Sequence, residues 1–151
     1  MSSSKTIAFT SVGGGPLAWS PSESGFGPQC LLIRSQAAWG KIAGTFSMNP
    51  ERSSPDGEKR LASVDFKRES ILAVTLGEIG STGFDIELQR IDTGPPAKLV
   101  MKSKRPAPDQ MTGAMMTHPF HLVILEAVSL PDSAVFELDG KPAAFERHVF
   151  E

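Results

Sequence analysis

The sequence predicts an α+β, β-rich fold: an antiparallel sheet, a sandwich or a small barrel, with one short helix packed on it. Residues 71–76 are almost wholly apolar, as in a strand that is covered on both faces. Residues 84–88 alternate between apolar and acidic side chains, which is the period of a half-exposed strand. Only one short helical pattern occurs, so the repeated βα alternation of a parallel sheet is missing.

The N-terminal part predicts one strand and one loop. Residues 7–12 are typical of a strand, and we expect Gly13-Gly14-Gly15-Pro16 to break it. Residues 16–28 are rich in Ser, Gly and Pro and predict a surface loop. We therefore treat residues 1–29 as an N-terminal strand and loop of the same domain, and residues 30–151 as its β-rich body.

The next segment predicts a buried strand and the one helix. Residues 30–33 form the strand, and Ser35 is placed to cap a helix over residues 36–42. Ala38, Trp39 and Ile42 share one face of that helix. Residues 49–59 predict a long polar connection, because they contain Asn-Pro and Pro-Asp-Gly turn signals.

The remaining elements are all strands. The strand over residues 71–76 is joined by a small-residue turn to the one over residues 84–88, which Ile91 extends. Further strands are expected over residues 98–104, 120–128, 134–138 and 143–146. Asp139-Gly140 between the last two is a hairpin signal, and Pro142 places the return strand at an edge. The prolines of residues 105–109 exclude that segment from a sheet interior.

Composition limits the partners and cofactors. The chain has 151 residues, enough for one core, and a net charge of −2 without a basic patch, so we expect no nucleic-acid partner. No apolar run approaches the roughly 20 residues of a membrane-spanning helix, and the first residues lack the apolar core of a signal peptide. Cys30 is the single cysteine, which excludes an intrachain disulfide and a multi-cysteine zinc site.

Three blocks of the sequence together resemble the PrcB C-terminal domain family of bacterial accessory proteins. Residues 31–39 are similar to that family's strand followed by a tryptophan-bearing helix. Residues 64–77 are similar to its Asp-Phe-x-x-Glu run into an apolar strand ending in Gly, and residues 116–123 to its Thr-x-Pro-Tyr-His-Leu-Val strand entry. The resemblance covers roughly residues 30–128. It implies a non-catalytic protein that binds and stabilises or regulates a protease, in the cell envelope or secreted.

The turn before the second strand departs from the family pattern. Where the family has an Arg-Pro-Thr-Gly-Gly-Tyr type turn, this chain has Ile79-Gly80-Ser81-Thr82-Gly83-Phe84, without the arginine, the proline or the tyrosine. Its Thr-Gly pair is also similar to the loops of chagasin-like protease inhibitors. We predict partner contacts at Gly80, Ser81, Thr82, Gly83 and Phe84, because glycines and small hydroxyl residues suit a loop held out by two strands. The alternative is a plain wide hairpin connection.

A second rim of contacts is predicted on the loop over residues 105–116, including Arg105 and Met111. Met111, Met115 and Met116 suit either an adaptable contact surface or the closed end of a core. Trp19, an aromatic residue within the polar N-terminal loop, suits docking onto the body or a partner.

The sequence contains no convincing set of catalytic or metal-binding residues. His118 and His121 are three residues apart in a predicted strand, so they should point to opposite faces, and we expect His121 to hydrogen-bond a neighbouring loop. Cys30 begins an apolar run, which favours a structural role over a nucleophile. Asp65 and Glu69, flanked by Lys67 and Arg68, predict surface salt bridges. We expect no cofactor and no metal.

These observations favour a non-catalytic protein-binding module, with a protease as the partner. The second hypothesis is a small-ligand or carbohydrate-binding β-barrel, which requires a deep apolar pocket lined by Met and Phe side chains. The third is a hydrolase that uses His118 or His121, which requires a nucleophile beside the histidine and a carboxylate to orient it. The residue pattern indicates no particular oligomeric state.

Overall fold

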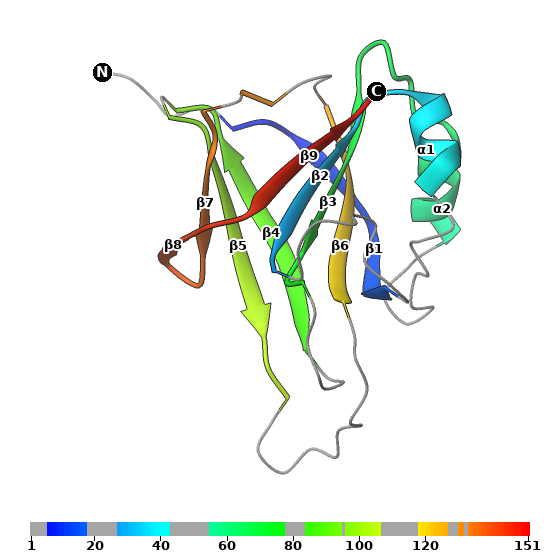
Figure 1. Cartoon of the computed structure of the whole chain (residues 1–151). Helices are drawn as coiled ribbons and strands as arrows, with labels where there is room; N and C mark the ends of the chain where they lie inside the picture. Colours follow the sequence, from blue (N-terminus) through cyan, green and yellow to red (C-terminus); the bar gives the residue numbers. More distant parts are fainter. Residues whose placement is uncertain are drawn as a thin grey trace.

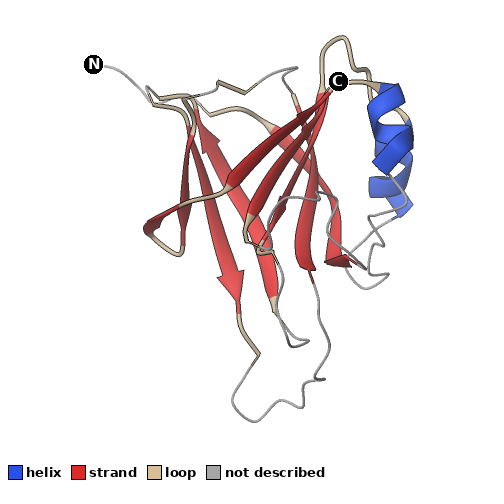
Figure 2. Ribbon diagram, viewed as in Figure 1, coloured by secondary structure: helices blue, strands red, loops and turns tan. Residues whose placement is uncertain are grey.

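The structure is a computed structural model that describes residues 6–17, 27–42, 55–77, 84–94, 96–106, 118–126, 130–131 and 133–151. Within these ranges it describes only the backbone of residues 15–17, 55–58 and 118. The strands form two sheets, and the helices lie on the outer face of the larger one (Figures 1 and 2). The predicted β-rich α+β class is confirmed, and of its alternatives the sandwich is the one observed.

The larger sheet has five strands. In spatial order they are β1 (Phe9–Leu17), β6 (His118–Leu125), β3 (Ser70–Thr75), β2 (Gln29–Ile33) and β9 (Glu146–Phe150). The smaller sheet has the order β4 (Asp85–Asp92), β5 (Lys98–Lys104), β7 (Val135–Leu138) and β8 (Lys141–Ala143). Most neighbours are antiparallel, but β2 pairs with β9 and β5 with β7 in parallel. The two parallel pairs are additions to the predicted antiparallel arrangement.

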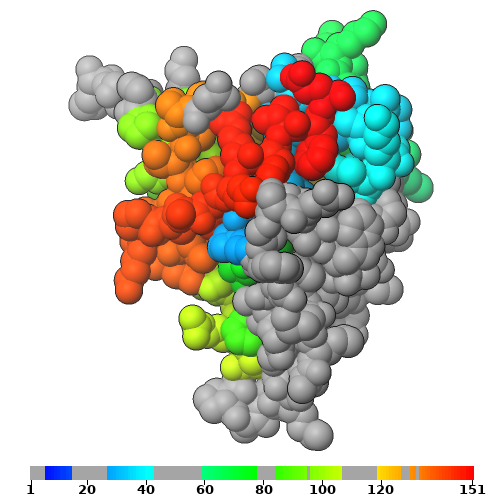
Figure 3. All heavy atoms as spheres, in the orientation of Figure 1, coloured from blue at the N-terminus to red at the C-terminus, as the bar shows by residue number. Residues whose placement is uncertain are grey.

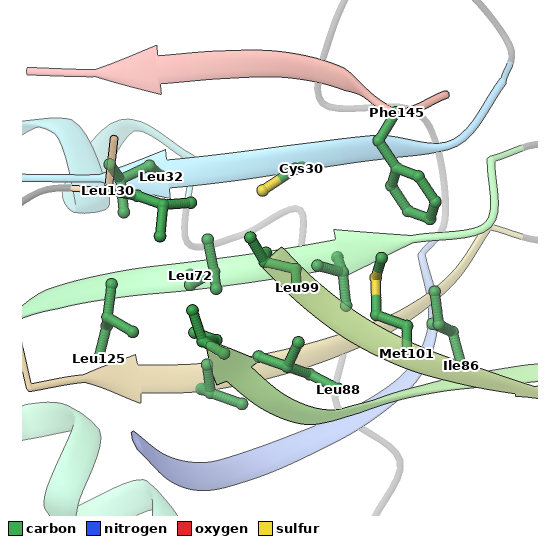
Figure 4. Close-up of a cluster of buried hydrophobic side chains, with 13 residues drawn as sticks. Cys30, Leu32, Leu72, Ile86, Leu88, Leu99, Met101, Leu125, Leu130 and Phe145 are labelled. Atoms are coloured by element: carbon green, nitrogen blue, oxygen red, sulfur yellow. The ribbon is translucent and has the colours of Figure 1, made fainter. Parts of the chain in front are cut away.

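The space between the sheets is filled by apolar side chains from both of them (Figure 4). The five-stranded sheet contributes alternate residues of its central strands, such as Leu32, Leu72 and Val123. The smaller sheet contributes Leu99 and Met101. This interlocking of two inner faces is the usual core of a sandwich.

The helices cover the other face of the five-stranded sheet. Helix α1 (Gln36–Ile42) and helix α2 (Pro55–Ala62) bring Trp39 and Leu61 against a second buried cluster that includes Ile71 and Phe120. The whole of β3 is therefore buried, as the apolar run over residues 71–76 predicts. The cap of α1 is also confirmed, because Ser35 Oγ accepts the Ala38 N–H at 3.1 Å.

Helix α2 contradicts the predicted polar connection over residues 55–59. Pro55 stands at the first position of the helix, where its missing N–H has no intrahelical partner in any case. In the last turn of the helix, the Arg60 guanidinium forms an ion pair with Glu69. The Pro-Asp-Gly sequence by itself does not favour a helix, so the packing of Leu61 against the sheet is needed to stabilise it.

The prediction that Gly13-Gly14-Gly15-Pro16 ends the first strand is wrong. Strand β1 continues through this segment, because Gly14, Gly15 and Pro16 pair with His121, Phe120 and Pro119 of β6. The register shifts between Ser11 and Gly13, which marks a bulge. Strand β1 lies at the edge of its sheet, and an edge tolerates a proline that donates no hydrogen bond.

Strands β3 and β4 do not form a hairpin, because they belong to different sheets. The alternative interpretation of residues 79–84 as a wide hairpin connection is therefore wrong, and this segment links the two layers. The Asp139-Gly140 hairpin is confirmed between β7 and β8, with φ angles of 53° and 80°. After β8 the chain crosses to the larger sheet as β9, which is exposed between the β7–β8 hairpin and α1 (Figure 3).

Candidate functional site

Two of the predicted contact residues lie at one end of the smaller sheet. Strand β4 begins at Asp85 and β5 ends at Lys104, and these two residues are paired. Phe84 and Arg105, the next residues outward, therefore lie at the same end of the sheet. Gly80, Ser81, Thr82, Gly83 and Met111 lie outside the described residues, as do Trp19, Met115 and Met116. Residues 84–87 and 102–105 together are called the ribbon end below.

The ribbon end extends beyond the neighbouring strand. Strand β7 pairs with residues 98–101 of β5, so residues 102–104 lie past its last pair. The Ser103 N–H instead donates to Asp139 Oδ1 at 2.8 Å, and the Ser103 hydroxyl donates to Asp139 Oδ2. These two hydrogen bonds lower the pKa of Asp139, to which nearby Arg105 and Lys102 add a smaller effect. The hairpin residue Asp139 thus fixes one side of the ribbon end.

The opposite side of the ribbon end is closed by another carboxylate. The Ile86 N–H donates to Asp85 Oδ1 at 2.9 Å instead of to a neighbouring strand. Farther along the same edge, the Ile7 N–H donates to the Ile91 carbonyl at 2.9 Å. Since backbone donors on both sides have intramolecular acceptors, a partner would contact the ribbon end through its side chains rather than by adding a strand.

The surface of the ribbon end combines a shallow hollow with exposed cations. The hollow has a volume of about 300 Å³ and is lined by Asp85, Ile86, Glu87, Lys102, Ser103 and Lys104. Lys102, Lys104 and Arg105 are exposed, and Phe84 is half-buried. An aromatic side chain beside arginine and lysine is a composition that suits protein contacts.

His121 lies between the two sheets and links three strands. Its side chain is 5% exposed on β6 and faces the smaller sheet. Nδ1 accepts the Leu88 N–H of β4 at 2.9 Å, and Nε2 lies 2.7 Å from Ser11 Oγ of β1. The predicted hydrogen bond of His121 is confirmed, but its partners belong to strands rather than to a loop.

The hydrogen bonds of His121 determine its chemistry. An imidazole nitrogen that accepts an N–H has no proton, so Nε2 holds the proton and donates it to Ser11 Oγ. A general base needs the reverse arrangement, in which a free Nε2 takes the serine proton while Nδ1–H is oriented by a carboxylate. The Ser11–His121 pair has the distance of a catalytic dyad but the tautomer of a structural one.

The other titratable candidates are held in structural roles. Cys30 is 1% exposed, and burial raises the pKa of its thiol to about 12, which keeps it protonated at neutral pH. Glu69 forms its ion pair with Arg60 of α2, rather than with the predicted Lys67 or Arg68. Hydrogen bonding from Arg60 lowers the pKa of Glu69. Asp65 accepts the Lys67 N–H at 3.1 Å in a local turn.

The described residues include no group of three or more His, Cys, Asp or Glu side chains that could hold a metal ion. The side chain of His118 is outside the description, so the prediction that His118 and His121 face opposite ways stays a prediction. Neither helix in the described segments has the length and apolar character needed to cross a bilayer.

Comparison with known proteins gives a family match for the part of the chain that contains the ribbon end and His121. Residues 70–126 match the PrcB C-terminal family. The family resemblance predicted from the sequence is thereby confirmed over the segment from β3 to the end of β6. It includes both strands of the ribbon end and His121, whereas residues 31–39 lie outside the match. A search of the curated proteins and of the solved structures finds no match to the chain.

Sequence reasoning missed three structural features near this end: the hydrogen bonds to Asp85 and to Asp139, and the Ser11–His121–Leu88 link. Asp139 was recognised only as a turn residue, and Ser11 is 110 positions from His121. An aspartate in a tight hairpin turn often accepts a backbone N–H from its own turn, but Asp139 accepts one from 36 positions away. No local pattern signals the histidine link.

Proposed function

We propose that this protein is a non-catalytic protein-binding module that stabilises or regulates a bacterial protease, and that the ribbon end is part of its contact surface. The observation that carries the proposal is the PrcB C-terminal match, because membership of that family implies an accessory role in a protease complex. The match includes both strands of the ribbon end, so the proposed surface belongs to the segment that matches the family.

The geometry of the ribbon end supports the same proposal. Phe84 and Arg105 flank the end of two paired strands, and hydrogen bonds to Asp85 and Asp139 lie on the two sides of that end. A rigid surface loses little conformational entropy on binding, which favours affinity. The tautomer of His121 supports the non-catalytic part of the proposal, since Nε2–H cannot accept a proton from Ser11.

The first experiment is site-specific photocrosslinking in cells of the source organism. A photoreactive phenylalanine analogue replaces Phe84 in one variant and Val135 in the control. Val135 is 41% exposed and pairs with Lys98, at the opposite end of β5. We expect a protease to be crosslinked from position 84 and not from position 135. Equal crosslinking from both positions, or crosslinked proteins that include no protease, would contradict the proposal.

The second experiment measures affinity with the crosslinked protease. Arg105→Glu should weaken binding by roughly tenfold or more, as expected for an arginine at the centre of a contact. Lys141→Glu is the matched control, because Lys141 is an exposed cation on β8 of the same sheet. If both variants weaken binding equally, net charge rather than the ribbon end determines the affinity.

The small-ligand hypothesis receives less support. The space between the sheets is filled by the side chains shown in Figure 4, and the sheets form a sandwich rather than a closed barrel. Met101 and Phe120 are fully buried, and their side chains pack within the two apolar clusters. The hollow at the ribbon end is lined mainly by charged residues, unlike the apolar pockets that hold most small ligands.

A further inference from the structure

We propose that His121 is an acid-sensitive link between the two sheets, which holds β4 against β6 when neutral and releases it when protonated. The imidazole is buried, and it is bonded at both nitrogens to strands other than its own. Its bond to Leu88 crosses from one sheet to the other, so it is a contact between layers and not part of either ladder.

Protonation removes one of the two hydrogen bonds for a simple reason. A doubly protonated imidazole has a donor at each nitrogen and no acceptor. Nδ1–H would then face the Leu88 N–H at the distance of a hydrogen bond, and the buried Leu88 N–H would lose its acceptor. The bond from Nε2–H to Ser11 Oγ survives the same change. Acid therefore acts selectively on the link to β4.

The ladder partners of the imidazole carry no charge that would offset this effect. The residues paired with His121 are Gly14 on β1 and Val74 on β3, and neither side chain ionises. On β4, Glu87 and Arg90 flank the linked segment but are exposed. Cys30, which pairs with Val74 on the next strand, stays a neutral thiol near neutral pH.

The position of Leu88 gives the link a consequence for the ribbon end. Leu88 lies at the bulge of β4, where the pairing with β5 shifts register before Arg90. The other described links on this edge, through Ile7 and Thr6, join β4 at Ile91 and Asp92, farther from Phe84. Loss of the His121 bond thus loosens the half of β4 that ends at Phe84. An effect of this loosening on partner binding would rest on the proposed function, whereas the hydrogen bond between His121 and Leu88 does not.

Amide hydrogen exchange in the full chain tests the link without any partner. We expect the protection factor of the Leu88 amide to fall by roughly tenfold or more as the solution is acidified from neutral pH, because protonation of His121 removes the acceptor of this amide. In His121→Asn the amide oxygen takes the place of Nδ1 and does not titrate, so the protection should become independent of pH. His148→Gln, at a partly exposed histidine of β9, should keep the wild-type response.

Two results would overturn the proposal. One is a Leu88 protection factor that changes with pH equally in the wild type and in His121→Asn. The other is a ¹⁵N spectrum of the wild-type imidazole in which Nδ1 carries a proton at neutral pH, and this measurement decides the question even if His121→Asn fails to fold. The exchange measurement uses no partner. Its failure would overturn the acid-sensitive link at His121, whereas failure of crosslinking from Phe84 would overturn the proposed function.

Discussion

Adjacent residues Ile71 and Leu72 provide a direct test of the three-layer arrangement. Both are fully buried in β3, but Leu72 faces the smaller sheet and Ile71 faces the helices. Truncation of either to alanine removes three carbon atoms, or roughly 2.5 kcal/mol of transfer free energy. The cavity left behind raises the expected loss to about 3–5 kcal/mol. We predict losses of this size for Ile71→Ala and for Leu72→Ala alike.

Urea unfolding followed by circular dichroism measures both losses, provided that the slope of the transition stays at the wild-type value. Val135→Ala is the control, because Val135 is 41% exposed and its truncation should change the unfolding free energy by less than about 0.5 kcal/mol. A loss below about 1 kcal/mol for Ile71→Ala, beside a full loss for Leu72→Ala, would refute the helix layer. If the alanine variants do not fold, Ile71→Val should still cost about 0.5–1.5 kcal/mol.

Three further predictions concern single side chains. Ser35→Ala should lower the unfolding free energy by about 1 kcal/mol, because the Ala38 N–H loses its cap, and Ser35→Asn should restore most of it in the same urea assay. Because burial raises the pKa of the Cys30 thiol to about 12, stability should be unaffected by this group below pH 9.0 and should fall by roughly 1.4 kcal/mol per pH unit above it. The same steep fall in Cys30→Ala would show that other groups cause it. Because hydrogen bonds from Ser103 lower the pKa of Asp139, its contribution is present above pH 3.8 and is lost as the pH falls further. Acid unfolding of Asp139→Asn should therefore be less steep than that of the wild type, and an identical profile would contradict the assignment.

The parts of the fold that could be predicted are those with strong local patterns. The apolar run over residues 71–76 became a strand buried on both faces, and the alternation before Leu88 became a strand with one face in the core. The Asp139-Gly140 turn was recognisable because both residues adopt positive φ angles that few other residue pairs tolerate.

The failures share a different cause, which is that distant contacts overrode local preference. Three consecutive glycines and Pro16 have no intrinsic tendency to form a strand, but pairing with β6 holds them in one. In the same way, Pro55 begins a helix because Leu61 gains contacts on the sheet. The residue pattern also does not predict that β3 and β4, which are consecutive along the chain, belong to different sheets.

The candidate site was predictable only in part. Phe84 and Arg105 were identified from the resemblance and from loop composition, and their proximity follows from the pairing of Asp85 with Lys104. Asp139, which accepts the Ser103 N–H at this end, lies in the β7–β8 turn, and His121, which accepts the Leu88 N–H, lies on β6. Interactions between residues so far apart in the chain depend on a topology that one sequence does not reveal.

The strand order of the larger sheet has a consequence for folding kinetics. Of its paired neighbours, only β2 and β3 are consecutive strands along the chain, whereas β1 pairs with β6 and β2 also pairs with β9. Each such pairing closes a long loop before it gains any contact energy, which places the search for the native topology on the millisecond-to-second scale. The β7–β8 hairpin can form locally within microseconds, but the larger sheet must assemble late and almost all at once.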